Sequence, residues 1–149
     1  MKILKYTFTS PELDVINGEL VETGINEETY TFTLLFKGIG VFEELANKPL
    51  ITSLLSIASA DGSVKENAVE QMLSKDFISN LACASYVKIE GDRFHNNRAT
   101  AEEFKKTKAY SQIFKDMGFI EQLLTMAVEC VADEQKSKAK TKANTTSKN

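Results

Sequence analysis

The chain has few of the side chains on which most catalytic and metal sites depend. Its 149 residues include one histidine, two cysteines and no tryptophan. His95 lies in a polar segment, and neither Cys83 nor Cys130 has a second cysteine or a histidine at the spacing of metal ligands. We therefore predict no catalytic residue, no metal and no cofactor, and expect that the protein is not an enzyme. The two cysteines are expected to be buried thiols, as is usual in a reducing compartment.

Nucleotide-binding motifs are also incomplete. Gly38-Ile39-Gly40 precedes a helical segment, but Glu43 stands where a dinucleotide fingerprint has its third glycine, and its charge would repel a pyrophosphate. Basic residues do not alternate with aromatic residues along any expected strand, so the pattern of a nucleic-acid-binding sheet is absent. We predict no nucleic-acid partner.

Long apolar runs are missing as well. The most apolar segments, residues 49–60 and 118–132, are too short to cross a bilayer and are interrupted by polar side chains. The first ten residues alternate apolar and polar side chains, unlike a secretory signal. The sequence therefore predicts a cytoplasmic protein with no membrane partner.

Charge divides the chain into two parts. Residues 135–149 contain five lysines and no acid, whereas the other 134 residues contain all 21 acids against 13 basic residues. Residues 135–149 also have no aromatic or large aliphatic side chain whose burial could offset the loss of conformational entropy on ordering. We expect a single α+β domain at 1–134 and a disordered, lysine-rich tail at 135–149. A solvated terminus is favoured over a contact with nucleic acid, because the acidic domain would repel phosphate.

The hydrophobic period changes between residues 30 and 46. Apolar side chains occur at every second position from Tyr30 to Phe36, which is typical of a strand with one buried face. After Gly38 and Gly40 the spacing lengthens to the three- and four-residue steps of a helix that begins near Phe42. We expect a strand at 29–36, a hinge at the glycines and a helix that exposes Glu43 and Glu44.

The residues before this strand predict a small antiparallel sheet. Residues 3–9 alternate weakly and suggest one strand, and Asn17-Gly18 is a strong hairpin signal before a second strand at 19–23. Ser10-Pro11-Glu12 is expected to form a helical turn, and Asn26-Glu27-Glu28 a polar turn. The sheet would then have two or three strands.

The rest of the chain is expected to be mostly helical. One helix should follow Pro49, a second should occupy 64–74 after a capping box at Ser63–Glu66, and a third should begin near Phe77. Residues 82–90 are compatible with either helix or strand. A loop is expected at 91–99, and a capping box at 100–103 should open a further helix. The clearest helix is at 120–131, with its end near Asp133.

This organisation resembles the tail assembly chaperones of long-tailed bacteriophages and prophages. The resemblance rests on the strand-to-helix passage at residues 30–50, in which Phe42-Glu43-Glu44-Leu45 matches a hydrophobic-Glu-Glu pattern near the start of the helix. It implies a non-enzymatic cytoplasmic factor that binds the tape measure protein during tail morphogenesis and helps to recruit tail tube protein. The alternative is a phage structural component such as a tail terminator or a head–tail connector, which can share this size and α+β class.

A partner is expected to bind the exposed edge of the sheet and the first turn of the following helix. An edge strand and a neighbouring apolar stripe are common contact surfaces, and self-association through the same edge would give a homo-oligomer. The alternative that Phe42 and Leu45 belong to the core stays open, and Phe42→Glu is expected to leave the domain folded. The predicted protein-binding residues are Tyr30, Phe32, Phe36, Phe42, Glu43, Glu44 and Leu45.

Overall fold

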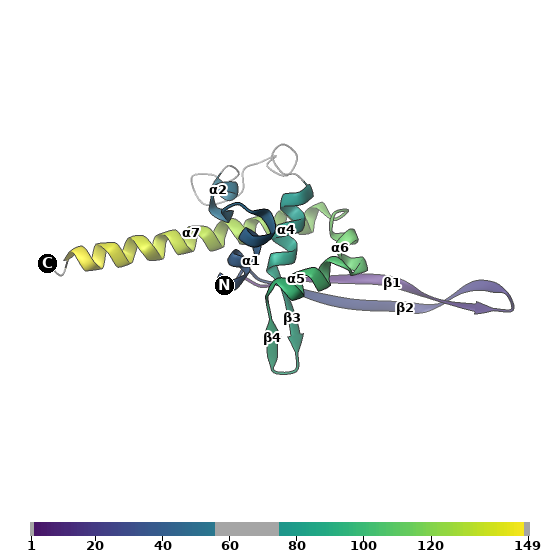
Figure 1. Cartoon of the computed structure of the whole chain (residues 1–149). Coiled ribbons are helices and arrows are strands. Elements are labelled where there is room, and N and C mark those ends of the chain that lie inside the picture. The colour runs from purple at the N-terminus through teal and green to yellow at the C-terminus, as the bar shows by residue number, and fades with distance from the viewer. Residues whose placement is uncertain (1, 56–74, 148–149) are drawn as a thin grey trace.

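The computed structural model describes residues 2–55 and 75–147, for residue 55 and residues 133–147 as backbone only. These residues form an α+β fold with a four-stranded antiparallel sheet in the order β1-β2-β3-β4 (Figure 1). The elements are β1 (Leu4–Ile16), β2 (Glu19–Phe32), α1 (Phe36–Ala46), α2 (Leu50–Leu55), α4 (Lys75–Ser85), β3 (Tyr86–Glu90), β4 (Arg93–His95), α5 (Arg98–Lys105), α6 (Lys108–Ile113) and α7 (Met117–Ser147). The helix predicted at 64–74, with its capping box at Ser63–Glu66, lies outside the described residues.

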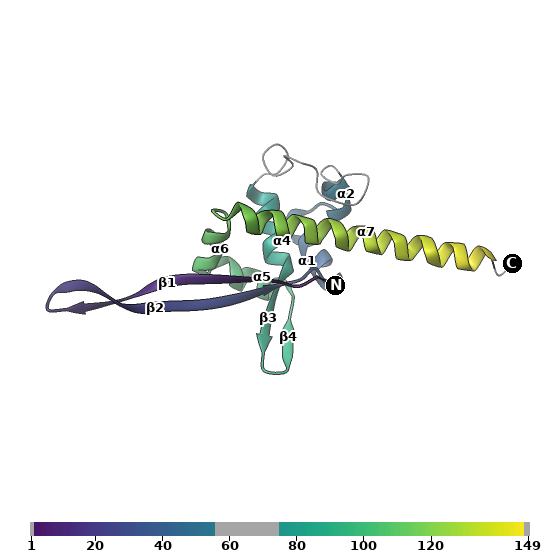
Figure 2. The ribbon, with the colours of Figure 1, turned by 180° about the vertical axis from the view of Figure 1, so that it is seen from behind.

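Strands β1 and β2 form a long hairpin that projects from the helical body (Figures 1 and 2). Its two-residue turn is Asn17-Gly18, as the sequence predicts, and both residues have positive φ angles, 53° and 79°. Such angles match the twist of the flanking strands and favour these two residue types. We call residues 10–26 of this hairpin the arm.

The arm corrects two predictions. Ser10-Pro11-Glu12 does not form a helical turn, and Asn26-Glu27-Glu28 is not a polar turn, because both segments lie in the ladder between β1 and β2. Pro11 is tolerated there because β1 is an edge strand, where a missing N–H need not break the sheet. Local turn signals were overridden by cross-strand pairing, which extends β1 and β2 well beyond the predicted strands.

A β-bulge interrupts the register inside the arm. Glu12 lies opposite Gly24 and Leu13 lies opposite Glu22, so Thr23 is the extra residue on β2. Because side chains alternate between faces, one extra residue moves the following side chains of β2 to the other face. Leu20 therefore lies on the face opposite to that of Tyr30 and Phe32, although all three have even numbers.

A second hairpin, β3–β4, completes the sheet. Strand β3 pairs with β2 at Thr31↔Val87 and Phe32↔Tyr86, and with β4 from Lys88 to Glu90. The open question at residues 82–90 is thereby answered, since α4 ends at Ser85 and a strand begins at Tyr86. The predicted loop at 91–99 includes β4. The sheet has four strands instead of two or three because this later hairpin joins it.

The strand-to-helix passage is present, but it comes earlier than predicted. Strand β2 ends at Phe32 and α1 begins at Phe36, so the change of direction is at residues 33–35 and not at the glycines. Thr33 fixes this passage: its N–H donates to the carbonyl oxygen of Ser85 at 2.9 Å, and its hydroxyl donates to that of Lys2 at 2.8 Å. Gly38 and Gly40 lie inside α1.

Gly38 allows α1 to lie close to the end of α4. A Cβ atom at this position would lie 2.7 Å from the carbonyl oxygen of Ala84 and 3.1 Å from Oδ1 of Asn96. Asn96 is itself held in place, because its Nδ2 donates to the carbonyl oxygens of Ala84 and Tyr86 at 2.9 and 2.8 Å. The helix crossing therefore depends on the missing side chain.

Replacing Gly38 with alanine is expected to lower the free energy of unfolding by about 1–3 kcal/mol, because backbone atoms must move to accept the methyl group. Gly40 is the matched control, since it is exposed on the same helix and a Cβ there would have no neighbour within 4 Å. Gly40→Ala should raise the free energy of unfolding by about 0.5–1 kcal/mol through helix propensity. Urea denaturation of both variants measures the difference; equal effects would contradict the close crossing.

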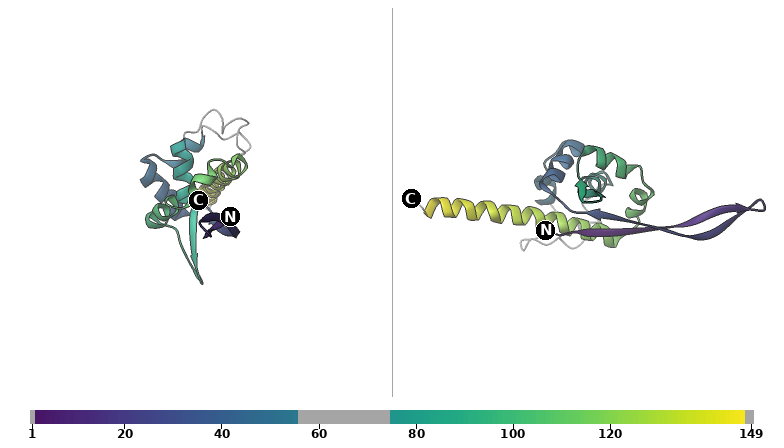
Figure 3. Two further views of the ribbon diagram at one scale, coloured as in Figure 1. Left: turned by 90° about the vertical axis from the view of Figure 1, so that its right-hand side faces the viewer. Right: turned by 90° about the horizontal axis from the view of Figure 1, so that it is seen from below.

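The helices cover one face of the sheet near the body, and the arm extends beyond them (Figure 3). Aromatic rings form the contact: Phe32 lies 5.3 Å from Phe104 of α5 and 5.1 Å from Phe119 of α7, measured between ring centroids. Tyr6 also contacts Phe119, at 5.0 Å. The predicted inward positions of the last helix are confirmed, since the apolar side chains from Ile120 to Val131 are buried.

The N-cap of helix α5 lies three residues before the predicted cap, Thr100. The N-cap is Asn97, whose Oδ1 accepts a hydrogen bond from the N–H of Thr100 at 3.0 Å. The hydroxyl of Thr100 in turn accepts from the N–H of Asn97 at 2.9 Å, which completes a capping box. Thr100 therefore has the third helical position instead of the cap, because the asparagine offers an equally good cap one turn earlier.

Helix α7 continues to Ser147, past the predicted end at Asp133. Residues 135–147, expected to be disordered, are helical in this structure. The segment contains no glycine or proline, and its four lysines and two alanines are good helix formers. Its separation from the 1–134 domain stays a prediction. Among the helices of the described residues, none combines the length and the apolar character needed to cross a bilayer.

Candidate protein-binding surfaces

The predicted binding residues divide into buried and exposed groups. Phe32 and Phe42 are 0% and 1% exposed and belong to the core, and Tyr30 and Leu45 are half-buried against it. The stripe that begins at Phe42 is therefore core, which answers the question left open by its spacing. This corrects the predicted surface, because the folded chain cannot present Phe32 or Phe42 to a partner.

Three of the predicted residues remain accessible on α1. Phe36 is 83% exposed at the first position of the helix, and Glu43 and Glu44 are exposed near its end. Phe36 lies outside the core because α1 starts there and directs its side chain outward. The strand alternation that placed it on the same face as Tyr30 ends before this residue. Whether these three residues contact a partner stays a prediction.

The accessible strand edge also differs from the predicted one. At Thr31 and Phe32 strand β2 is paired on both sides, with β1 and with β3. Open edges lie instead along β1, which is the outer strand, and along the part of β2 that extends beyond β3. The arm therefore presents two unpaired edges, a feature that native proteins usually protect.

One face of the arm is apolar. By strand alternation and the bulge, cross-strand pairing places Val15 with Leu20 on the face that also carries Leu13 and Ile25. Val15 and Leu20 are 72% and 69% exposed. We call Leu13, Val15, Leu20 and Ile25 the apolar stripe. Grouped exposed apolar side chains of this kind mark contact surfaces far more often than single ones do.

The sequence contains a pattern that indicates this stripe, but the turns predicted at residues 10–12 and 26–28 concealed it. Leu13 and Val15 are separated by Asp14 on one side of Asn17-Gly18, and Leu20 follows Glu19 on the other side. The arm is also acidic: it contains Glu12, Asp14, Glu19 and Glu22 and no lysine or arginine. Three of these acids lie on the face opposite the stripe, and Glu22 lies on the same face as the stripe.

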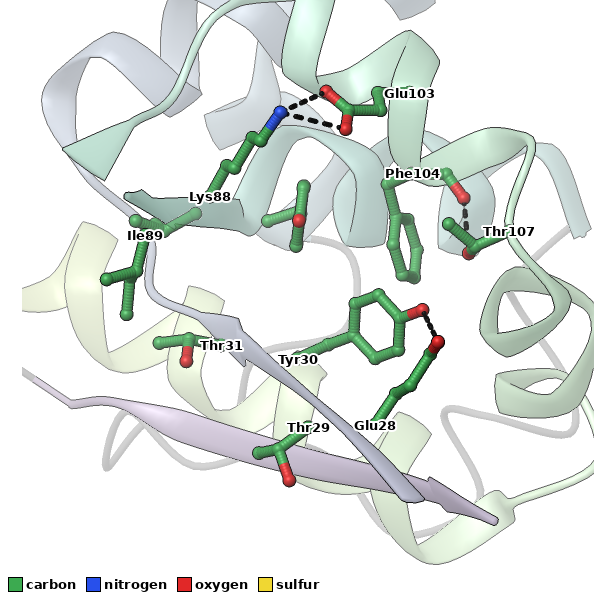
Figure 4. A pocket seen from close by; sticks show the side chains of 11 residues that line it. Glu28, Thr29, Tyr30, Thr31, Lys88, Ile89, Glu103, Phe104 and Thr107 are labelled. Carbon is green, nitrogen blue, oxygen red and sulfur yellow. Dashed lines mark hydrogen bonds and ion pairs between the residues drawn. The ribbon is translucent and has the colours of Figure 1, made fainter. Parts of the chain in front are cut away.

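A groove of about 370 Å³ opens where β2 and β3 diverge (Figure 4). Its walls are β2 from Glu28 to Thr31 and β3 from Tyr86 to Ile89, with Phe104 and Thr107 on the helical side. The floor is aromatic: the ring centroids of Tyr30 and Phe104 are 5.6 Å apart, and those of Tyr86 and Phe104 are 5.0 Å apart in a stacked pair.

Polar contacts hold the walls of this groove. Lys88 Nζ lies 3.0 Å from a carboxylate oxygen of Glu103, which joins β3 to α5, and Tyr30 donates a hydrogen bond of 2.6 Å to Glu28 (Figure 4). Burial, reinforced by the hydrogen bond and the charge of Glu28, raises the pKa of Tyr30 to about 12. This phenol is therefore neutral at physiological pH.

Further apolar and basic residues are neighbours of the lining residues Ile89 and Thr107. Ile89 and Phe94 are cross-strand partners on the β3–β4 hairpin, and both are 61% exposed. On the helical side, exposed lysines precede and follow Thr107 at the α5–α6 junction; they are Lys105, Lys106 and Lys108. The lining of the groove itself combines the rings of Tyr30, Tyr86 and Phe104 with two acids, Glu28 and Glu103, and one base, Lys88.

The described residues offer limited reactive chemistry. Burial raises the pKa of the Cys83 thiol to about 11, which opposes formation of the thiolate that nucleophilic cysteines need. His95 Nε2 lies 3.3 Å from a carboxylate oxygen of Glu90 on the exposed β3–β4 hairpin. Within residues 2–55 and 75–147, no three acidic, cysteine or histidine side chains are grouped so that they could hold a metal ion.

Comparisons with protein-family models, with curated proteins and with solved structures find no match for this chain. The arm, the groove and the exposed face of α1 therefore have to be interpreted from their own chemistry.

Proposed function

We propose that this chain is a non-enzymatic protein-binding factor whose main contact surface is the arm. The observation that carries this proposal is the apolar stripe, four exposed large side chains on one face of a hairpin that stands away from the body. Single exposed apolar residues are common on protein surfaces. A stripe of them on a projecting element is unfavourable in water, and contact with a partner would remove that unfavourable hydration.

The specific role that we propose is a tail assembly chaperone of a long-tailed phage or prophage. In that role the chain binds the tape measure protein in the host cytoplasm and helps to recruit tail tube protein. The resemblance at residues 30–50 supports the assignment, as does the combination of an apolar contact surface with an acidic body. A soluble holdase needs both, because net charge keeps its complexes apart while apolar surface retains the client.

A phage structural component, such as a tail terminator or a head–tail connector, is the second candidate. The length of the arm favours it, since a preformed hairpin that reaches beyond its own body suits a fixed contact between neighbouring subunits. The two candidates differ in where the protein ends up: a structural component is present in purified virions, and an assembly chaperone is absent from them. Mass spectrometry of purified particles separates the two.

Coexpression with the long helical protein encoded beside it is expected to show the chaperone role. The wild type should raise the soluble yield of that client several-fold, and Val15→Asp/Leu20→Asp should remove most of the gain, because two charges on the stripe prevent apolar contact. The matched control is Ile16→Asp/Val21→Asp, which places the same two charges on the opposite face of the arm.

Two measurements decide the outcome: circular dichroism of the variants and the soluble yield of the client. Circular dichroism must show that both double variants are folded, which their exposed positions lead us to expect. If the wild type leaves the client insoluble, the chaperone role is wrong and the structural component becomes the leading assignment. If both double variants lose the gain equally, the stripe is not the contact surface.

A further inference from the structure

The two ends of the molecule carry opposite charge. Residues 6–36, which contain both strands of the arm, include six acids and no lysine or arginine. The C-terminal part of α7, residues 135–147, includes four lysines and no acid. We propose that residues 135–147 of one copy dock on the arm of a second copy, on the face opposite the apolar stripe. This proposal goes beyond the binding of a client and does not depend on it.

The docking face continues the sheet face that the helices cover. Near the body this face carries Tyr6 and Phe32, whose rings lie 5.0 and 5.1 Å from that of Phe119 of α7. The extra residue of the bulge is on β2, so the even-numbered side chains of β1 stay on this face along the arm. We call the outer part of this face the inner face of the arm; its residues are Glu12, Asp14, Ile16, Glu19 and Val21.

The inner face has no cover within the described residues. All five of its side chains are exposed, and the apolar ones, Ile16 and Val21, are 48% and 37% exposed. The helices that cover the same face beside the body do not extend over the arm (Figure 3). A helix laid on the inner face would therefore extend an arrangement that the body already contains.

Charge selects which helix can lie there. Three acids of the inner face disfavour a second acidic surface, including the inner face of another arm. The lysines around Thr107 are close in sequence to Glu102 and Glu103, whereas residues 135–147 contain no acid. Lysine also suits a face with both acids and apolar groups, because its methylene groups can cover apolar side chains while its ammonium group stays near a carboxylate.

The contact requires two molecules. The arm and the C-terminal end of α7 extend from the body in opposite directions (Figures 1 and 2). Their sizes match, since residues 135–147 of the helix and residues 10–16 of the strand each span about 20 Å. Because each copy has one arm and one such helical end, the copies associate head to tail and form a chain or a ring instead of a symmetric dimer.

Charge variants on the two faces of the arm test this contact by molar mass. After nuclease treatment and at low ionic strength, the wild type should form complexes whose mass exceeds that of a dimer and rises with concentration. Size-exclusion chromatography with light scattering measures this mass. Glu12→Lys/Glu19→Lys should weaken association at least tenfold. Glu22→Lys/Glu27→Lys is the matched control, since it makes the same charge change on the opposite face of the hairpin. Circular dichroism and thermal unfolding establish that each variant is folded.

Salt provides a second measurement on the wild type. Raising the ionic strength from about 0.01 M to about 1 M shortens the Debye length from about 30 Å to about 3 Å. A contact between an acidic face and a basic helix should weaken at least tenfold over this range.

Variants of α7 test the other side of the contact. Lys136→Glu/Lys138→Glu/Lys140→Glu/Lys142→Glu should abolish association, and arginine at the same four positions should preserve it. Glu12→Lys/Asp14→Lys/Glu19→Lys reverses the charge of the inner face and should abolish association as well. A mixture of the two reversed variants should associate, because each arm then meets a helical end of opposite charge.

A wild type that stays monomeric at low ionic strength and high micromolar concentration would overturn the proposal. Equal weakening by the inner-face variant and its control would also overturn it, as would a mixture of the reversed variants that stays monomeric. Association that nuclease treatment removes would assign the basic helical end to nucleic acid instead. The client assay is independent: a monomer that still keeps the client soluble refutes the docking alone, and an oligomer without effect on the client refutes the chaperone role alone.

Discussion

Replacing Phe42 with glutamate is expected to unfold the protein. Phe42 is 1% exposed in the core, and its ring packs 5.5 Å from that of Phe77. A carboxylate at this position would lose its hydration without gaining a partner, and the large apolar side chain would be lost as well. The free energy of unfolding should fall by more than about 4 kcal/mol, a large part of the total stability of a domain of this size.

The control for this variant lies six residues earlier. Phe36→Glu places the same charge on the same helix at a position that is 83% exposed, and it should change the free energy of unfolding by less than about 0.5 kcal/mol. Thermal unfolding followed by circular dichroism compares the two. A folded and stable Phe42→Glu protein would mean that α1 does not pack as described and that the original prediction of an accessible Phe42 was right.

Truncating Phe104 to alanine is expected to cost about 3–5 kcal/mol of the free energy of unfolding, as for other fully buried aromatic side chains. Its ring connects both hairpins to α5, because it contacts Tyr30 and Phe32 of β2 and Tyr86 of β3. Phe104 also forms the floor of the groove. The loss should therefore appear as a lower free energy of unfolding.

Phe94→Ala is the matched truncation for Phe104→Ala. Phe94 is 61% exposed on β4, so its removal should change the free energy of unfolding by less than about 1 kcal/mol. Guanidinium chloride denaturation of the two variants gives the comparison. A similar loss for both would contradict the distinction between a core ring and an exposed ring on the β3–β4 hairpin.

The sequence was sufficient for features that depend on short-range chemistry. Asn17-Gly18 forms the predicted turn because few other pairs adopt positive φ twice. The helix after Pro49 and the helix near residues 120–131 are confirmed because their apolar spacing matches one buried face. The α+β class and the strand-to-helix passage follow from the same periodicities.

The remaining features depend on pairing across the chain. Residues 10–12 and 26–28 have the composition of turns, yet each segment forms a ladder with the opposite strand. This pairing depends on the other strand, so the local sequence does not predict it. Strand β3 likewise pairs with a segment more than fifty residues away. The candidate surface was misplaced for the same reason: Phe32 and Phe42 have the spacing of a contact stripe, and only the packing of α4, α5 and α7 decides that they are covered.

The bend at the Thr23 bulge sets the direction of the outer part of the arm. It lies about five residues from the turn, so a change of 20° in the local bend would move the tip by roughly 5 Å. Deleting Thr23 would preserve the cross-strand partners on both sides, because Glu12 already faces Gly24 and Leu13 already faces Glu22. The direction of the arm can thus change in evolution without a change in the side chains that it carries. The loss of one codon would be enough to turn the same stripe toward a partner in a different position.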